Sequence, residues 1–186
     1  SYAGHKDSYF TEKFIWHIFV QLCDGLKHLH EHGIVHRDLK TMNVMIIKSH
    51  SSKHDDDQYI VKIADLGVSR QLSEETMMLQ TFYGTPLYLS PELVENKQYN
   101  EKTDLWSLGV ILYELATLVH PFKSNTILGL AKLVCKGVYE PVSSYTTKYS
   151  KDISRCIKWL LNIDYLLRPN IVQVLKFAQD AGSIHG

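Results

Sequence analysis

Two short stretches of the sequence bring together side chains that could do chemistry. Residues 36–43 read His-Arg-Asp-Leu-Lys-Thr-Met-Asn, and Asp65 opens the triplet Asp-Leu-Gly further along the chain. A carboxylate can take up a proton, an ammonium group can neutralise an anion, and carboxylate and amide oxygens suit hard cations. Each residue alone also has a plainer explanation. Asp38 can cap a turn, Lys40 can be a surface charge, and Asn43 can close a loop by bonding its own backbone.

A helix is predicted immediately ahead of the first stretch. Apolar residues recur on one helical face across residues 12–32, and Gly33 follows where a helix would end. This amphipathic helix leads directly into residues 36–43. His28 and His32 near its end could in principle share a metal ion. No carboxylate or cysteine completes such a set, and histidines are ordinary in a last helical turn, so we expect them to be structural.

A β-hairpin is predicted between the two chemical stretches. Short runs rich in β-branched residues cover 44–47 and 59–63, and the residues 48–58 between them are polar. The acidic tract 54–57 lacks the glycine and the terminal glutamate of a calcium-binding loop, so we interpret it as solvated. Because Asp65 follows the second strand, a loop and the end of the hairpin have to converge if the two stretches act together.

The rest of the chain is predicted to be helical. Residues 105–119 are apolar nearly all round, which predicts a helix in the middle of the domain that ends before His120 and Pro121. Residues 71–91 show neither helical nor strand periodicity. A loop of this length usually has a function of its own. Further helices are predicted at 124–136, at 150–162 and after Pro169.

Composition excludes several classes of protein. The chain has 186 residues, with 20 Lys and Arg against 20 Asp and Glu. This balance argues against a protein that binds nucleic acid or a membrane surface, because both need excess positive charge. The longest apolar run is too short to span a bilayer. Cys23, Cys135 and Cys156 lie among apolar helical neighbours, so we expect reduced core thiols and an intracellular, cytoplasmic protein.

The motifs, taken together, resemble those of a eukaryotic protein kinase. Residues 36–43 match H-R-D-L-K-x-x-N, and residues 65–67 match D-F-G with Leu in place of Phe. Residues 90–92 read Ser-Pro-Glu where the family usually has A-P-E. The runs at 104–109 and 168–169 fall where the family has its central helix and a late arginine. The resemblance therefore covers essentially the whole chain.

The resemblance implies an α+β fold, the mainly helical C-terminal lobe of the kinase domain with a small hairpin. This lobe would occupy residues 1–186, with a catalytic loop at 36–43 and an activation segment at 65–92. No G-x-G-x-x-G loop and no V-A-I-K lysine occur in the sequence. We therefore expect a fragment that lacks the N-terminal lobe, and negligible turnover from the isolated chain.

The resemblance also assigns roles in phosphoryl transfer from ATP. Asp38 would accept or orient the proton of the substrate hydroxyl, and Lys40 would reach the γ-phosphate. Asn43 and Asp65 would bind Mg²⁺, which prefers oxygen ligands. Met45 matches the position that forms the apolar floor beneath adenine.

Four further side chains are expected to support the site. By resemblance, the ring of His36 packs on the side chain after the metal-binding aspartate, here Leu66. Glu92 and Arg168 would form a buried ion pair, and Asp104 would accept backbone N–H groups of the catalytic loop.

The resemblance is to Ser/Thr kinases in particular. Lys40 together with Thr85 and the proline after it is typical of that type, and Thr85 could hydrogen-bond to Asp38 and Lys40. Residues 84–93, with the Asp-Leu-Gly triplet, look most like the NIMA-related kinases.

Regulation by phosphorylation is a further hypothesis. Arg37 is an unpaired cation beside the catalytic base, and Arg70 stands where the family supplies a second basic residue. A phosphate on the loop between them would gather charge-assisted hydrogen bonds. Thr81 is the best-placed acceptor for an activating kinase, with Thr76 and Ser73 behind it, although Thr81 could also be a simple polar loop residue.

Two functions from different classes follow. The first is an ATP-dependent kinase that acts on Ser and Thr of protein substrates. The second is a non-catalytic scaffold or binding module built on the large lobe, and upstream coding sequence would discriminate between them.

Overall fold

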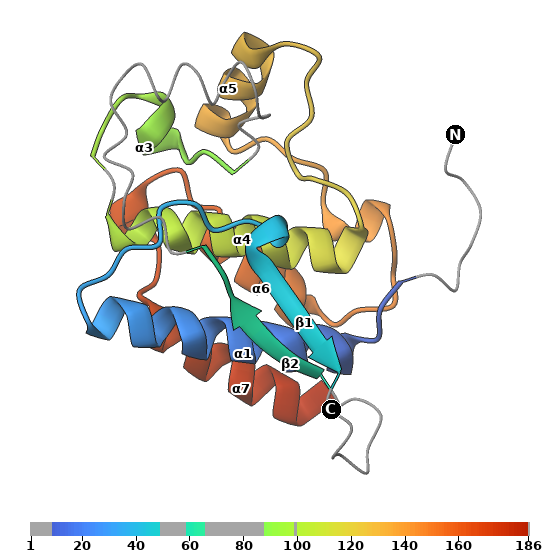
Figure 1. Ribbon diagram of the computed structural model, residues 1–186. Helices are drawn as coiled ribbons and strands as arrows, with labels where there is room; N and C mark the ends of the chain where they lie inside the picture. The colour runs from blue at the N-terminus through green and yellow to red at the C-terminus, as the bar shows by residue number, and fades with distance from the viewer. Residues whose placement is uncertain (1–8, 49–58, 66–87, 99, 186) are drawn as a thin grey trace.

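The computed structural model describes residues 9–48, 59–65, 88–98 and 100–185, and the statements below refer to them. Figure 1 shows a helical body with one two-stranded sheet on its surface. The predicted α+β class is confirmed.

Helix α1 (Glu12–Glu31) matches the helix predicted at residues 12–32 to within one residue. The hydroxyl of Thr11 accepts the N–H of Phe14 at 3.1 Å and so begins the helix, and His32 ends it. Its buried face carries residues such as Ile15, Phe19 and Leu26, because apolar residues three and four apart share one side of a helix.

The predicted hairpin is also present. Strands β1 (Val44–Lys48) and β2 (Tyr59–Ile63) pair antiparallel, with Val44 opposite Ile63 and Lys48 opposite Tyr59. The predicted loop lies outside the described residues, apart from Lys48 itself. The short 3₁₀-helix η1 (Thr41–Asn43) leads straight into β1, so the register of the hairpin fixes where Asn43 lies.

The remaining elements form the rest of the helical body. In order along the chain they are α3 (Pro91–Val94), α4 (Glu101–Thr117), α5 (Ile127–Lys136), η3 (Val142–Ser144), α6 (Lys151–Leu160), η4 (Tyr165–Leu167) and α7 (Ile171–His185).

Several predicted boundaries are wrong, for local reasons. The central helix α4 begins four residues early because Asn100 and Thr103 form a capping box around its polar first turn. It ends at Thr117, two residues before the predicted end at residue 119, because its C-cap Leu118 has a left-handed φ of 58°. Helix α5 starts only after Thr126, whose hydroxyl accepts the Gly129 N–H. Helix α3 was not predicted, because a four-residue helix has no periodicity to detect.

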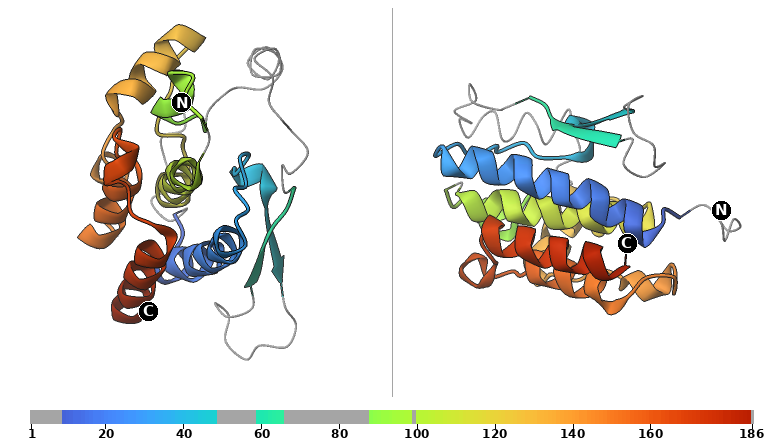
Figure 2. Two further views of the ribbon diagram at one scale, coloured as in Figure 1. Left: turned by 90° about the vertical axis from the view of Figure 1, so that its left-hand side faces the viewer. Right: turned by 90° about the horizontal axis from the view of Figure 1, so that it is seen from below.

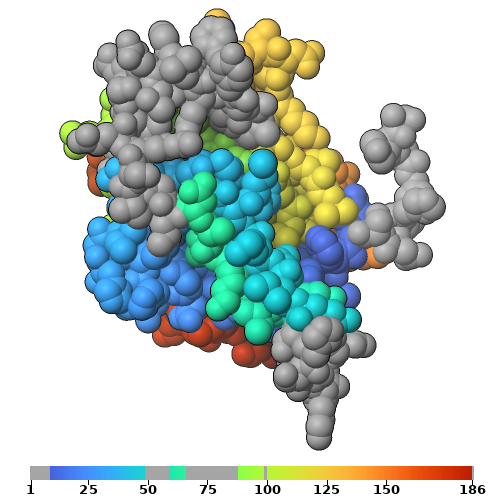
Figure 3. Space-filling view, in the orientation of Figure 1, coloured from blue at the N-terminus to red at the C-terminus, as the bar shows by residue number. Residues whose placement is uncertain are grey.

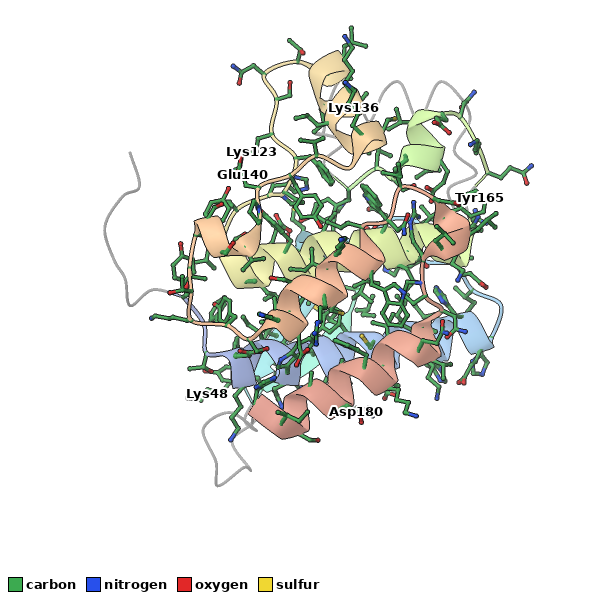
Figure 4. All side chains as sticks on the ribbon, turned by 180° about the vertical axis from the view of Figure 1, so that it is seen from behind. Lys48, Lys123, Lys136, Glu140, Tyr165 and Asp180 are labelled. Carbon is green, nitrogen blue, oxygen red and sulfur yellow. The ribbon has the colours of Figure 1, made fainter. Side chains whose placement is uncertain are left out.

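The elements are arranged in layers. In the two views of Figure 2 the hairpin lies against α1, and α4 runs beside α1 in the next layer. Helices α6 and α7 cover the opposite side, where the view from behind in Figure 4 shows outward-pointing side chains such as that of Asp180. No helix among the described residues is long and apolar enough to cross a membrane.

Helix α4 is the centre of the core, as its unbroken apolar sequence predicts. Its residues are buried on every side of the helix, and Trp106 stacks on Phe122 with ring centroids 5.5 Å apart. At Gly109 a Cβ atom would come within 2.7 Å of the Leu160 Cβ, so this glycine allows α6 to pack directly on α4. Any larger residue at position 109 would separate the two helices.

The positions of the three cysteines agree in part with the prediction that they are reduced core thiols. All three are free thiols, and Cys23 and Cys156 are buried in the core. Burial raises the pKa of both of these thiols. Cys135 is only partly buried, which corrects the prediction that it is a core residue, because it lies on the outer part of α5.

The predicted ion pair between Glu92 and Arg168 ties α3 to the core. Two bonds of 2.7 Å join the guanidinium to the carboxylate, and neither side chain is more than 2% exposed. Thr103 on α4 donates to the same carboxylate at 3.1 Å, and the Arg168 Nε donates to the Asn162 carbonyl. Because every charge here has partners, the desolvation of the pair is compensated.

The same contacts set how the pair responds to acid. Burial alone would raise the pKa of Glu92, but the bonds from Arg168 outweigh it and hold that pKa below its ordinary value. The pair therefore contributes stability at neutral pH, and this contribution is lost as the pH falls through the lowered pKa.

We predict that Glu92→Ala destabilises the fold by about 3–5 kcal/mol, because it leaves the Arg168 guanidinium buried without a counter-ion. The matched control is Glu95→Ala, which removes an exposed carboxylate paired with Lys97 at 2.6 Å. Urea unfolding of both variants measures the difference. Equal midpoints for the two variants would contradict a structural role for the buried pair.

Candidate active site

Asp104 holds the start of the catalytic loop. Its side chain is 1% exposed in the first turn of α4. It accepts the backbone N–H of His36 at 2.9 Å on Oδ2 and the N–H of Arg37 at 3.0 Å on Oδ1. Arg37 has a φ of 70°, a left-handed conformation that costs a residue with a Cβ about 1–3 kcal/mol. The predicted role of Asp104 is thus seen in the structure.

His30 is a third partner of Asp104 that sequence reasoning missed. Its Nε2 donates to Asp104 Oδ2 at 2.9 Å, and its side chain is 8% exposed. The bond joins the last turn of α1 to the first turn of α4. No local pattern marks His30, because its partner is distant in the sequence and its neighbours His28 and His32 are exposed.

His36 links the catalytic loop to the end of the hairpin. Its Nε2 donates to the Ala64 carbonyl at 3.1 Å, and its Nδ1 accepts the N–H of Asp38 at 3.3 Å. Both bonds are satisfied by one neutral tautomer, with the proton on Nε2. The ring is fully buried, so His36 is structural as predicted, while its predicted contact with Leu66 lies outside the described residues.

The structure brings Asp38, Lys40 and Asn43 together. Lys40 Nζ donates to Asp38 Oδ2 at 2.7 Å. Asn43 Nδ2 donates to the backbone carbonyl of Asp38 at 2.7 Å and to its Oδ2 at 3.3 Å. About a third of the Asp38 and Lys40 side chains is exposed, so a substrate can reach them. Asn43 is 7% exposed and supports the pair from its buried side.

Asp65 reaches the same end of the hairpin. The N–H of Ala64 donates to the Asn43 carbonyl at 2.8 Å, so Asp65 follows a residue that is bonded to Asn43. Asp65 is exposed and has a φ of 57°, a conformation that aspartate tolerates better than most residues.

The donor set suits Mg²⁺. Asn43 uses its amide nitrogen on Asp38, which leaves Oδ1 without a hydrogen-bond partner in the described part of the chain. With the exposed carboxylate of Asp65 it offers two oxygen ligands, and Mg²⁺ takes few protein ligands because it keeps waters and phosphates. Within the described ranges no three His, Cys, Asp or Glu side chains gather, so His28 and His32 also lack a third ligand.

Met45 lies on an open apolar surface. It is 50% exposed on β1 and shares its face of the hairpin with Ile47 and Ile60, which are also exposed. Figure 3 shows the two strands at the surface of this side of the molecule. An uncovered apolar face next to Asn43 is compatible with the adenine floor that the resemblance implies.

The predicted regulatory residues are only partly described. Arg37 is exposed and makes no ion pair with any described residue. Arg70, Thr81 and Thr85 lie outside the described residues, so the proposed contacts of Thr85 with the catalytic loop stay predictions. Tyr88, which comes next, does contact that loop: its hydroxyl oxygen lies 2.8 Å from the Thr41 hydroxyl.

Comparison with known proteins identifies the family. The sequence model of the protein kinase domain matches residues 2–178, so the chain belongs to the protein kinase domain family. A crystal structure of Rad53 1-466 in complex with AMP-PNP superposes with a TM-score of 0.73 at 29% identity, over 92% of this chain and 41% of that chain.

Curated relatives narrow the resemblance to the Nek kinases. The chain is 40% identical to the serine/threonine-protein kinase Nek5 of Mus musculus, covering 90% of this chain and 25% of Nek5. It is also 40% identical to Nek10 of Homo sapiens, covering 94% of this chain and 14% of Nek10. The predicted kinase fold and the NIMA-related resemblance are confirmed. The chain spans a quarter or less of the length of these two relatives.

We predict that His30→Ala loosens the catalytic loop. It removes one of three donors to a buried carboxylate, which should destabilise the fold by about 1–3 kcal/mol. Amide exchange at residues 36–37 should become faster, since their N–H groups bond to the same carboxylate. The control His28→Ala changes an exposed side chain on the same helix. If both variants exchange at the wild-type rate, Asp104 does not depend on His30.

Proposed function

We propose that this chain is the C-terminal lobe of an ATP-dependent protein kinase that transfers the γ-phosphate to Ser and Thr hydroxyls of protein substrates. The observation that carries the proposal is the contact of Asp38 with both Lys40 and Asn43 at the solvent-facing end of the loop. The kinase relatives and their Ser/Thr names support the same reaction.

The chemistry asks the protein chiefly for position and charge. In phosphoryl transfer a hydroxyl has to lie in line with the phosphorus while charge on the transferred group is neutralised. Asp38 would accept a hydrogen bond from the substrate hydroxyl and so aim its oxygen. Lys40, held 2.7 Å from Asp38, would move its ammonium toward the γ-phosphate when that anion arrives. The base and the cation would thus both come from the loop at residues 36–43.

Asn43 and Asp65 would hold Mg²⁺. The ion would supply positive charge at the phosphate oxygens, which is its general role in this chemistry. Asn43 would present Oδ1, because its Nδ2 is committed to Asp38. We further propose Met45 as the contact for adenine, and the cytoplasm as the location, since three free thiols suit a reducing compartment.

We predict that Asp38→Asn lowers phosphate transfer by about 10²–10⁴-fold, the usual contribution of a positioned base. The assay uses the full-length protein that carries these residues, with ATP, Mg²⁺ and a generic Ser/Thr protein substrate. Asp24→Asn is the matched control, because Asp24 is an exposed carboxylate on α1. Equal loss in both variants would refute the assignment of the base. A folded wild-type protein without transfer would favour the scaffold.

We also propose that an activating kinase phosphorylates Thr81. The support is the guanidinium of Arg37 beside Asp38, which is exposed, makes no ion pair with the described residues and could receive a phosphate. Thr81→Ala should then prevent activation by upstream kinase treatment, whereas Thr76→Ala should not. Full activation of the Thr81→Ala protein would refute the proposal that Thr81 is the activating site.

A further inference from the structure

The side chain of Gln21 on α1 bonds to the backbone of strand β2. Its Nε2 donates to the Tyr59 carbonyl at 3.0 Å, and its Oε1 accepts the Val61 N–H at 3.1 Å. His17, one helical turn earlier, places its Nε2 3.0 Å from the same Tyr59 carbonyl. Helix α1 therefore holds the first half of β2 by its main chain, in addition to any packing of side chains.

The register of the hairpin explains why these backbone groups need partners. The N–H of Ala64 donates to the Asn43 carbonyl, and in an antiparallel pair such bonds recur at every second residue. Residues 60, 62 and 64 therefore turn their backbone groups toward β1, whereas residues 59, 61 and 63 turn theirs away from it. Within the described residues the sheet has two strands, so β2 has an open edge there.

The amide of Gln21 covers part of this open edge. A side-chain amide carries a donor and an acceptor, as a peptide group does, so it can bond to a strand in the way that another strand would. Here it takes one carbonyl and one N–H of β2. Both bonds have definite lengths and directions, so they set where the strand lies along α1.

The packing around Gln21 would not set this position alone. Gly25, one turn further along α1, lies close to β2: a Cβ at this position would be 3.2 Å from Ile63 Cδ1. A cavity of about 330 Å³ nevertheless lies between the helix and the strand, with Gln21 and Leu29 among its lining residues. Apolar contact has no preferred direction, so it tolerates a small shift of the strand where such space is available.

The other end of β2 belongs to the candidate active site. Ala64 follows the strand directly; its N–H donates to the Asn43 carbonyl at 2.8 Å, and its carbonyl accepts from His36 at 3.1 Å. Asp65 is the next residue. A strand rises about 3.3 Å per residue, so Ala64 lies about 10 Å along the chain from Val61. A shift of β2 along α1 would therefore move Ala64 and the turn at Asp65.

We propose that Gln21 is a positioning residue for Asp65, because it fixes the place of β2 along α1 and thereby keeps Asp65 near Asn43. This inference rests on the proposed function, under which Asn43 and Asp65 hold Mg²⁺, and it deepens that function. Gln21 itself touches neither the ion nor the reacting atoms. It acts through the backbone of β2.

The first test uses Gln21→Met in the full-length protein. Methionine has a similar length and volume but cannot make either backbone bond. We expect the Mg²⁺ concentration for half-maximal phosphate transfer to rise about tenfold, the lower end of the cost of losing a group that supports a metal ligand. The KM for the protein substrate should stay unchanged, because Asp38 and Lys40 lie in the loop at residues 36–43.

Thr11→Ala is the matched control on the same helix. It removes the hydrogen bond that the Thr11 hydroxyl accepts from Phe14 at 3.1 Å, away from β2. It should lower the thermal midpoint and leave the Mg²⁺ requirement unchanged. An unchanged Mg²⁺ requirement in Gln21→Met, or an equal rise in both variants, would overturn the proposal.

Hydrogen exchange separates this proposal from the proposed function. In Gln21→Met the Val61 amide loses its partner and exchanges faster in any case. The informative amide is that of Ala64, which should also exchange faster while the amides of α4 keep their wild-type rates. This result in a protein that transfers no phosphate would support the role of Gln21 in placing the turn at Asp65 while contradicting kinase activity. Faster exchange at Val61 alone, or throughout the core, would overturn the proposal.

Discussion

A single buried carboxylate, Asp104, holds the catalytic loop in a shape that the loop's own residues do not favour. The backbone of Arg37 has a left-handed conformation although the residue is not glycine. Nothing within residues 36–43 would by itself favour that conformation. Three donors on Asp104 compensate both this strain and the removal of a charge from water. The position of Asp104 in the first turn of α4 adds the favourable dipole of a helix N-terminus.

Asp104 can hold the loop in this shape only if α4, which carries it, is itself fixed in place. The helix is buried on all sides, and Gly109 lets α6 approach it closely, so it offers a rigid frame. Other segments attach to the same frame. Thr103 bonds to Glu92 of α3, and Glu114 bonds to Tyr88 ahead of α3. The catalytic loop and the segment after it are thus positioned by one helix, although neither is continuous with it in sequence.

The sequence could predict what is periodic or forms a motif. Apolar spacing placed α1, and β-branched runs placed both strands of the hairpin. The motif residues Asp38, Lys40 and Asn43 do assemble as the resemblance implied. Contacts such as those of His30 and Tyr88 could not be predicted, because they join ordinary residue types far apart in the chain. The polar first turn of α4 was missed because capping bonds, and not apolar spacing, form it.

The site also explains why an amide stands at position 43. Asn43 donates two hydrogen bonds through Nδ2 to Asp38, and under the proposed function its Oδ1 would bind a cation. A carboxylate at this position could hold the cation, but it would lack the donor and would repel Asp38 across the same short distance. A lysine or arginine would satisfy Asp38 but would repel the cation. An amide carries a donor and an acceptor on one planar group, so under the proposed function it could hold both the base and the cation.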